Sequence, residues 1–106
     1  MNRSIYMIAV AIAASIGTAP AWAGPSANQI CAKMISEGRG GSLDQKACLC
    51  TYRVADAVLD NDVKALLFDA WYTGKDNMPA LARLGNPQRV KKQLRTMHLS
   101  MKANCE

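Results

Sequence analysis

Residues 42–59 read SLDQKACLCTYRVADAVL, and their apolar side chains recur at intervals of three and four. This interval is typical of an amphipathic helix, so we predict a helix from Leu43 to about Leu59. Two positions along an α-helix are rotated by about 200° from each other, so Cys48 and Cys50 point to nearly opposite sides. They cannot bond to each other while the helix is intact, and each needs a partner from elsewhere in the chain.

The other two cysteines, Cys31 and Cys105, supply those partners. In a helical hairpin centred near Gly40, Cys31 lies nine residues before the turn, and its mirror position falls between the two cysteines of the second helix. One of these two is therefore predicted to bond Cys31 and the other Cys105, and the choice stays open. The spacing Cys-x16-Cys-x-Cys-x54-Cys contains no Cys-x-x-Cys motif and matches no zinc site, which favours structural disulfides over metal binding or redox chemistry.

The remaining apolar residues after position 23 also recur at helical intervals, and no stretch alternates as a strand would. Ser-x-x-Gln capping boxes at Ser26 and Ser42 mark the first two helix starts. We place the other helices between Ser26 and Gly38, between Asp62 and Gly74, between Pro79 and Gly85, and from Pro87 to Cys105. The sequence thus predicts an all-α fold, a small bundle of four to five helices cross-linked by two disulfides, as a single domain over residues 24–106.

The first 23 residues are typical of a secretory signal peptide. Arg3 gives a positive start, residues 5–17 are almost entirely apolar, and Ala21-Trp22-Ala23 is a small-x-small cleavage site. The apolar run is shorter than the roughly 20 residues of a membrane span, so we expect no stable membrane insertion. We therefore expect a periplasmic or secreted protein that begins at Gly24, in a compartment where disulfides form.

Positive charge is concentrated near the C-terminus. The chain has 13 Lys and Arg against 8 Asp and Glu, but residues 83–105 hold six basic and no acidic residues. Within the last helix, one stripe of residues lies beside the apolar face at steps of four, three and four: Lys91, Arg95, His98 and Lys102. The candidate partner-binding residues are Arg89, Lys91, Lys92, Arg95, His98 and Lys102.

Two interpretations of these residues remain open. They could contact an anionic or acidic cell-envelope component or another exported protein, or they could form a solvated face partly neutralised by acidic residues elsewhere. The acidic residues available for neutralisation are Asp56, Asp60, Asp62, Asp69 and Asp76. Nucleic acid is not expected as a partner of an exported protein.

No catalytic constellation is found. His98 is the only histidine, and no glycine-rich phosphate loop, His-Glu-x-x-His helix or acidic calcium loop occurs, so we expect neither enzymatic activity nor a cofactor. Met97 and Met101 beside His98 are residue types that bind copper. Both methionines also continue the apolar stripe of the last helix, which favours core packing and no metal site.

These observations predict a small exported protein that binds a partner through its basic last helix, such as an inhibitor or immunity-type partner of another exported protein. The layout is similar to that of small disulfide-bonded periplasmic helical proteins, a class that includes acid-stress chaperones. A stress chaperone that exposes apolar surface on partial unfolding is therefore one alternative. A copper- or thiol-handling protein is the other.

Overall fold

The computed structural model describes residues 24–106, and the predicted signal peptide and its cleavage site lie outside the described residues. This part of the chain forms helices joined by short loops and contains no strand. The helices are α2 (Ala27–Ser36), α3 (Gln45–Val58), α4 (Asn61–Thr73), α5 (Met78–Ala82) and α6 (Pro87–Cys105). The predicted all-α fold with two disulfides is confirmed.

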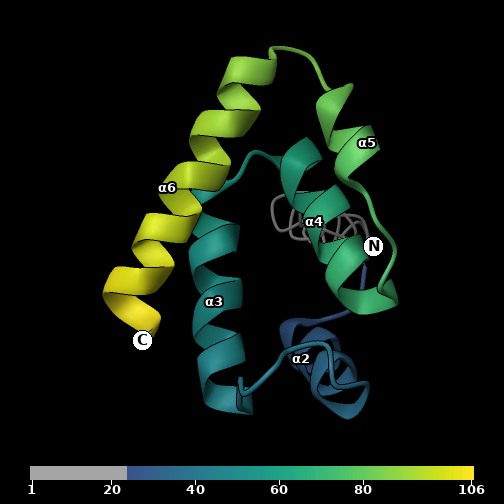
Figure 1. Ribbon diagram of the computed structural model, residues 1–106, viewed down its shortest axis with the longest axis vertical. Coiled ribbons are helices and arrows are strands. Elements are labelled where there is room, and N and C mark those ends of the chain that lie inside the picture. The colour runs from purple at the N-terminus through teal and green to yellow at the C-terminus, as the bar shows by residue number, and fades with distance from the viewer. Residues whose placement is uncertain (1–23) are drawn as a thin grey trace, which may run out of the picture.

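Helix α3 lies between the first and last helices of the described chain. Helix α6 packs along one side of α3, and α2 packs on another side, near the N-terminal end of α3 (Figure 1). Helix α4 packs on α2, and the short α5 contacts both α4 and α6. The chain therefore forms an arch in which α5 and the loop after it connect α4 to the N-terminal end of α6 (Figure 1).

The hydrophobic core receives side chains from all five helices, because each helix turns its apolar stripe inward. Phe68 is completely buried, and its ring stacks on Tyr52 of α3 with 4.4 Å between the ring centroids. The buried core residues are Ile30, Ala55, Leu59, Val63, Phe68, Leu81 and Val90.

The two disulfides attach both ends of the described chain to α3. Cys31 bonds Cys48, and Cys50 bonds Cys105, which settles the pairing that the sequence left open. The first disulfide is buried in the α2–α3 contact, whereas Cys50 and Cys105 are both half-buried. The absence of a bond between Cys48 and Cys50 is confirmed, as their positions on one helix predicted.

One of the two predicted capping boxes is wrong. Ser26 and Gln29 form theirs, with hydrogen bonds of 3.2 and 2.8 Å. Helix α3, however, begins at Gln45 and not at Leu43, and its N-cap is Asp44, which accepts a 2.8 Å hydrogen bond from the Ala47 amide. Aspartate caps a helix as well as serine does, so the later residue starts the helix.

Candidate functional site

Helix α6 has an apolar face that packs into the protein. Val90 is buried near its start, and Leu94 and Met97 pack against the core one and two turns further on. Met101 is half-buried, and Cys105 ends the stripe in the disulfide to α3. The predicted core role of this stripe, including Met97, agrees with these positions.

Beside this apolar face, α6 carries a basic face, which we define as Lys91, Lys92, Arg95, His98 and Lys102. All five side chains are exposed. No ion pair within residues 24–106 involves any of the four Lys and Arg residues. The face therefore presents positive charge to solvent along three turns of helix.

Four of the five acidic residues that were candidates for neutralising this face form ion pairs with other residues, and the fifth, Asp76, accepts a 3.0 Å hydrogen bond from the Met78 backbone N–H. Asp56 forms a 2.9 Å ion pair with Lys64, a mostly buried lysine of α4. Asp69 lies 3.7 Å from the ammonium group of Lys75. Asp60 and Asp62 both bind Arg89. This distribution favours the interpretation of the basic face as an uncompensated surface.

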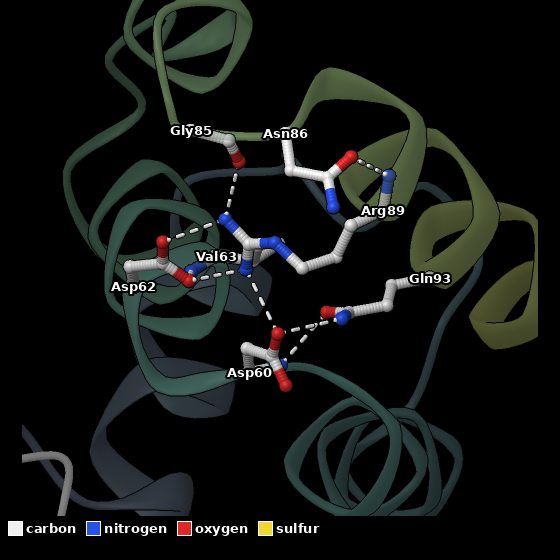
Figure 2. A network of polar contacts seen from close by, with 7 residues as sticks. All are labelled: Asp60, Asp62, Val63, Gly85, Asn86, Arg89 and Gln93. Carbon is white, nitrogen blue, oxygen red and sulfur yellow. Dashed lines mark hydrogen bonds and ion pairs between the residues drawn. The ribbon is translucent and has the colours of Figure 1, made fainter.

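Arg89 is set apart from the other predicted binding residues, because its guanidinium group is engaged inside the molecule. It donates two hydrogen bonds to the two carboxylate oxygens of Asp62, at 2.9 and 3.0 Å. It also donates to Asp60 at 2.8 Å and to the Gly85 carbonyl at 2.7 Å (Figure 2). Only 24% of the Arg89 side chain is exposed, so we do not include it in the basic face.

Gln93 completes this network, which we call the Arg89 clamp: Asp60, Asp62, Gly85, Arg89 and Gln93. The Gln93 amide donates to the Asp60 carboxylate at 2.8 Å and accepts from the Asp60 backbone N–H at the same distance (Figure 2). The Asp60 carboxylate is thereby turned away from the α4 N-terminus, where it makes no capping hydrogen bond. The clamp joins the start of α4 to the first two turns of α6.

The clamp also shifts the acidity of its members. Hydrogen bonds from Gln93 and Arg89 hold the pKa of Asp60 below its ordinary value, and the hydrogen bonds from Arg89 do the same for the pKa of Asp62. The two carboxylates in turn raise the pKa of Arg89 above its ordinary value. All three groups are therefore charged at neutral pH.

Two of the hollows that border the basic face share Lys91. Lys91, Lys92 and Arg95 line a shallow hollow of about 270 Å³ together with Gln88. A second and largely apolar cleft of about 330 Å³ lies between α5 and α6. Its lining residues are Met78, Leu81, Ala82, Pro87, Val90, Lys91 and Leu94. Lys91 lines both, so positive charge stands at the edge of the apolar cleft.

Sequence reasoning missed this cleft and two polar anchors. Arg39, in the loop between α2 and α3, donates to the Trp71 carbonyl and, at 3.0 Å, to the Tyr72 carbonyl at the end of α4. Lys64 is 8% exposed despite its charge. For the cleft, the available signal was the short segment between the helix starts at Pro79 and Pro87. For the contact of Arg39 with the C-terminal end of α4, the signal was an arginine between two glycines.

Other candidate chemistry finds little support in the described residues. All four cysteines lie in disulfides, so none offers a thiol. Within residues 24–106, no cluster of three or more His, Cys, Asp or Glu side chains is placed to hold a metal ion. No helix in the same range has the length and apolarity needed to span a membrane.

The chain was compared with protein families, curated proteins and solved structures. No family model matches it, and no curated protein or solved structure matches it either. The candidate site therefore rests on the geometry of the basic face and the adjoining cleft.

Proposed function

We propose that this is a small exported binding protein, without a catalytic role, that recognises an acidic region of another exported protein through the basic face of α6. The observation that carries the proposal is the state of that face: its lysines and arginines are exposed and unpaired within residues 24–106, while Asp56, Asp60, Asp62 and Asp69 are paired elsewhere. An inhibitor or an immunity-type protein would act in this way.

The mounting of α6 supports this role. The Arg89 clamp holds the helix near its start, the core contacts of Leu94 and Met97 hold its middle, and the Cys50–Cys105 disulfide holds its end. A surface that is ordered before binding loses less conformational entropy when a partner arrives. Uncompensated charge also accelerates the encounter with an oppositely charged partner.

The compartment follows from the cysteines and the N-terminal sequence. Two disulfides indicate an oxidising environment outside the cytoplasm. The signal-peptide pattern of residues 1–23 supports export to the periplasm or to the medium.

A capture experiment tests the proposed function. Immobilised protein is incubated with a cell-envelope extract, and a dominant acidic partner is expected to bind and to be released by salt, because exposed charges are screened over about 10 Å at 0.1 M salt. Replacing Lys91, Arg95 and Lys102 by Gln should abolish capture. The control replaces Lys33, Lys46 and Lys75 by Gln, which removes the same charge from α2, α3 and the loop after α4. Equal capture by both variants would contradict the proposal.

The Arg89 clamp also favours a second candidate, an acid-stress chaperone. Its carboxylates become protonated in strong acid, which weakens the contact between α4 and α6 and loosens the apolar face of α6. A chaperone should bind a hydrophobic dye and suppress aggregation of a client as the pH falls. A binding protein of the kind proposed should capture its partner at neutral pH. It should neither bind the dye nor suppress aggregation of a client as the pH falls.

A further inference from the structure

We propose that the cleft between α5 and α6 receives an apolar side chain of an acidic amphipathic helix in the partner protein. This inference rests on the proposed function and adds to it the chemistry that makes recognition specific. Charge alone attracts many acidic proteins, whereas an apolar anchor in a pocket selects among them.

The cleft has the size and lining that such an anchor needs. Its volume is about 330 Å³, whereas an apolar cavity of about 150 Å³ already accommodates benzene. The wall consists of side chains from α5 and α6, including the buried Leu81 and Val90 and the half-buried Leu94. Met78, at the start of α5, leaves 60% of its surface exposed and so adds exposed apolar area at the edge of the cleft.

The surroundings of the cleft indicate an acidic occupant. Lys91 lines both the cleft and the basic hollow, so an apolar group in the cleft lies beside a cation. Leu99 leaves 59% of its surface exposed and follows Arg95 by one helical turn, which places a second apolar spot on the basic side of α6. The partner surface complementary to this pattern alternates carboxylates with apolar side chains.

A helix presents that pattern in the matching register. Lys91, Arg95, His98 and Lys102 are spaced at steps of four, three and four, over about 16 Å at 1.5 Å per residue. Glutamates at the same steps on a partner helix would lie along this stripe, and the apolar residues between them would face the cleft. Binding of an amphipathic helix by a groove is a common mode of peptide recognition.

A lipid surface fits these observations less well. An amphipathic helix that binds a membrane inserts its apolar face among the acyl chains. The apolar face of α6 instead packs on the protein through Val90, Leu94 and Met97. The apolar feature next to the basic face is a concave cleft, which receives a side chain but does not penetrate a bilayer.

Two fluorescently labelled synthetic peptides test the proposal. Both are helical and carry glutamates at steps of four, three and four; one has leucine at the anchor positions and the other alanine. Binding to the disulfide-bonded protein is measured by fluorescence anisotropy. The leucine peptide is expected to bind about tenfold more tightly, which is the effect of one well-placed apolar anchor.

Two variants locate the effect in the cleft. Ala82→Trp fills the cleft from an exposed position, and Met78→Gln removes its apolar edge. Each should bring the affinity ratio of the two peptides close to one and leave binding of the alanine peptide unchanged. Ile35→Gln is the matched control, because Ile35 is also a large exposed apolar residue and lies on α2, away from α5 and α6 (Figure 1). Circular dichroism confirms that each variant is folded.

The outcomes separate this inference from the proposed function. Equal binding of both peptides to the wild-type protein, or an unchanged ratio in both cleft variants, overturns the cleft as an anchor site and leaves electrostatic recognition intact. If neither peptide binds the wild-type protein more tightly than the variant with Gln at positions 91, 95 and 102, both proposals fail. Binding to phosphatidylglycerol vesicles but to neither peptide would overturn the assignment of a protein partner.

Discussion

The two terminal guanidinium nitrogens of Arg89 each donate a hydrogen bond to one carboxylate oxygen of Asp62, at 2.9 and 3.0 Å. The two residues are 27 positions apart and lie in the first turns of α6 and α4. Paired hydrogen bonds of this kind fix orientation as well as distance. This pair therefore fixes the start of α6 against the start of α4, and with it the orientation of the basic face.

We predict that Arg89→Gln lowers the melting temperature although it removes a single side chain near the surface. The substitution leaves Asp60 and Asp62 close together without a cation, so their negative charges repel each other. Arg95→Gln is the control, since Arg95 is exposed and has no ion pair within residues 24–106. Thermal unfolding followed by circular dichroism should show a lower melting temperature for Arg89→Gln and an unchanged one for Arg95→Gln.

The clamp also predicts the direction of the pH dependence of stability. A carboxyl group whose pKa is lower in the folded than in the unfolded chain stabilises the fold above its ordinary pKa, and this contribution is lost as the pH falls through the folded value. The ordinary pKa of Asp60 and Asp62 is 3.8, and that of Glu37, whose pKa is lowered by its hydrogen bond from Arg39, is 4.5. Stability should therefore decrease as the pH falls below these values.

The double variant Asp60→Asn, Asp62→Asn provides the comparison for this pH dependence. It should be less stable than the wild-type protein at neutral pH and should lose less stability on acidification. Urea unfolding at a series of pH values down to about 2 measures both effects. Parallel curves for the two proteins would show that other groups cause the acid sensitivity.

The two disulfides should differ in accessibility. Cys31 and Cys48 are 0% and 2% exposed, whereas Cys50 and Cys105 are half-buried. Mild reduction followed by alkylation and peptide mapping should therefore label Cys50 and Cys105 first, because exchange requires access of the attacking thiolate. The double variant Cys50→Ser, Cys105→Ser opens a 55-residue loop and should cost about 4 kcal/mol of stability in the chain-entropy model.

Phe68→Ala should be among the most destabilising substitutions in the domain. The ring is completely buried and packs between Tyr52 and Trp71, with centroid distances of 4.4 and 5.4 Å. Truncation of such a side chain costs about 3–5 kcal/mol, which approaches the whole stability of a small domain. Denaturant unfolding with the disulfides intact measures the loss, and a change under 1 kcal/mol would contradict the burial of Phe68.

The helices could be predicted from the sequence because each has a local signal. Ser26 and Gln29 cap α2 within one turn, and Pro87 starts α6. The opposite directions of Cys48 and Cys50 likewise follow from the geometry of one helix. The disulfide partner of each cysteine could not be predicted, because the mirror position of Cys31 falls between Cys48 and Cys50. The pairing depends on how α2 is rotated against α3.

The site could be predicted only in part, for a similar reason. The spacing of Lys91, Arg95 and Lys102 places them on one face without further information. The position of Arg89 on α6 does not show that two aspartates at the start of α4 lie within its reach. The cleft depends on the packing of α5 against α6. The distance between these two helices is not determined by the periodicity of either one.

The two disulfides also determine what a protease can release from the folded protein. The Cys31–Cys48 and Cys50–Cys105 bonds close two consecutive covalent rings, and Leu49 is the single residue between them. A single cut at a peptide bond inside either ring, such as one in the Gly38–Gly41 or Gly74–Asn77 loop, leaves the two fragments joined by a disulfide. Only the two peptide bonds that flank Leu49 lie outside both rings. They are inside α3, where the hydrogen-bonded backbone resists cleavage. Among secreted proteases, one cut in each ring would thus leave every segment between the first and last cysteines covalently attached, whereas a second cut in the same ring would free the stretch between the two cuts.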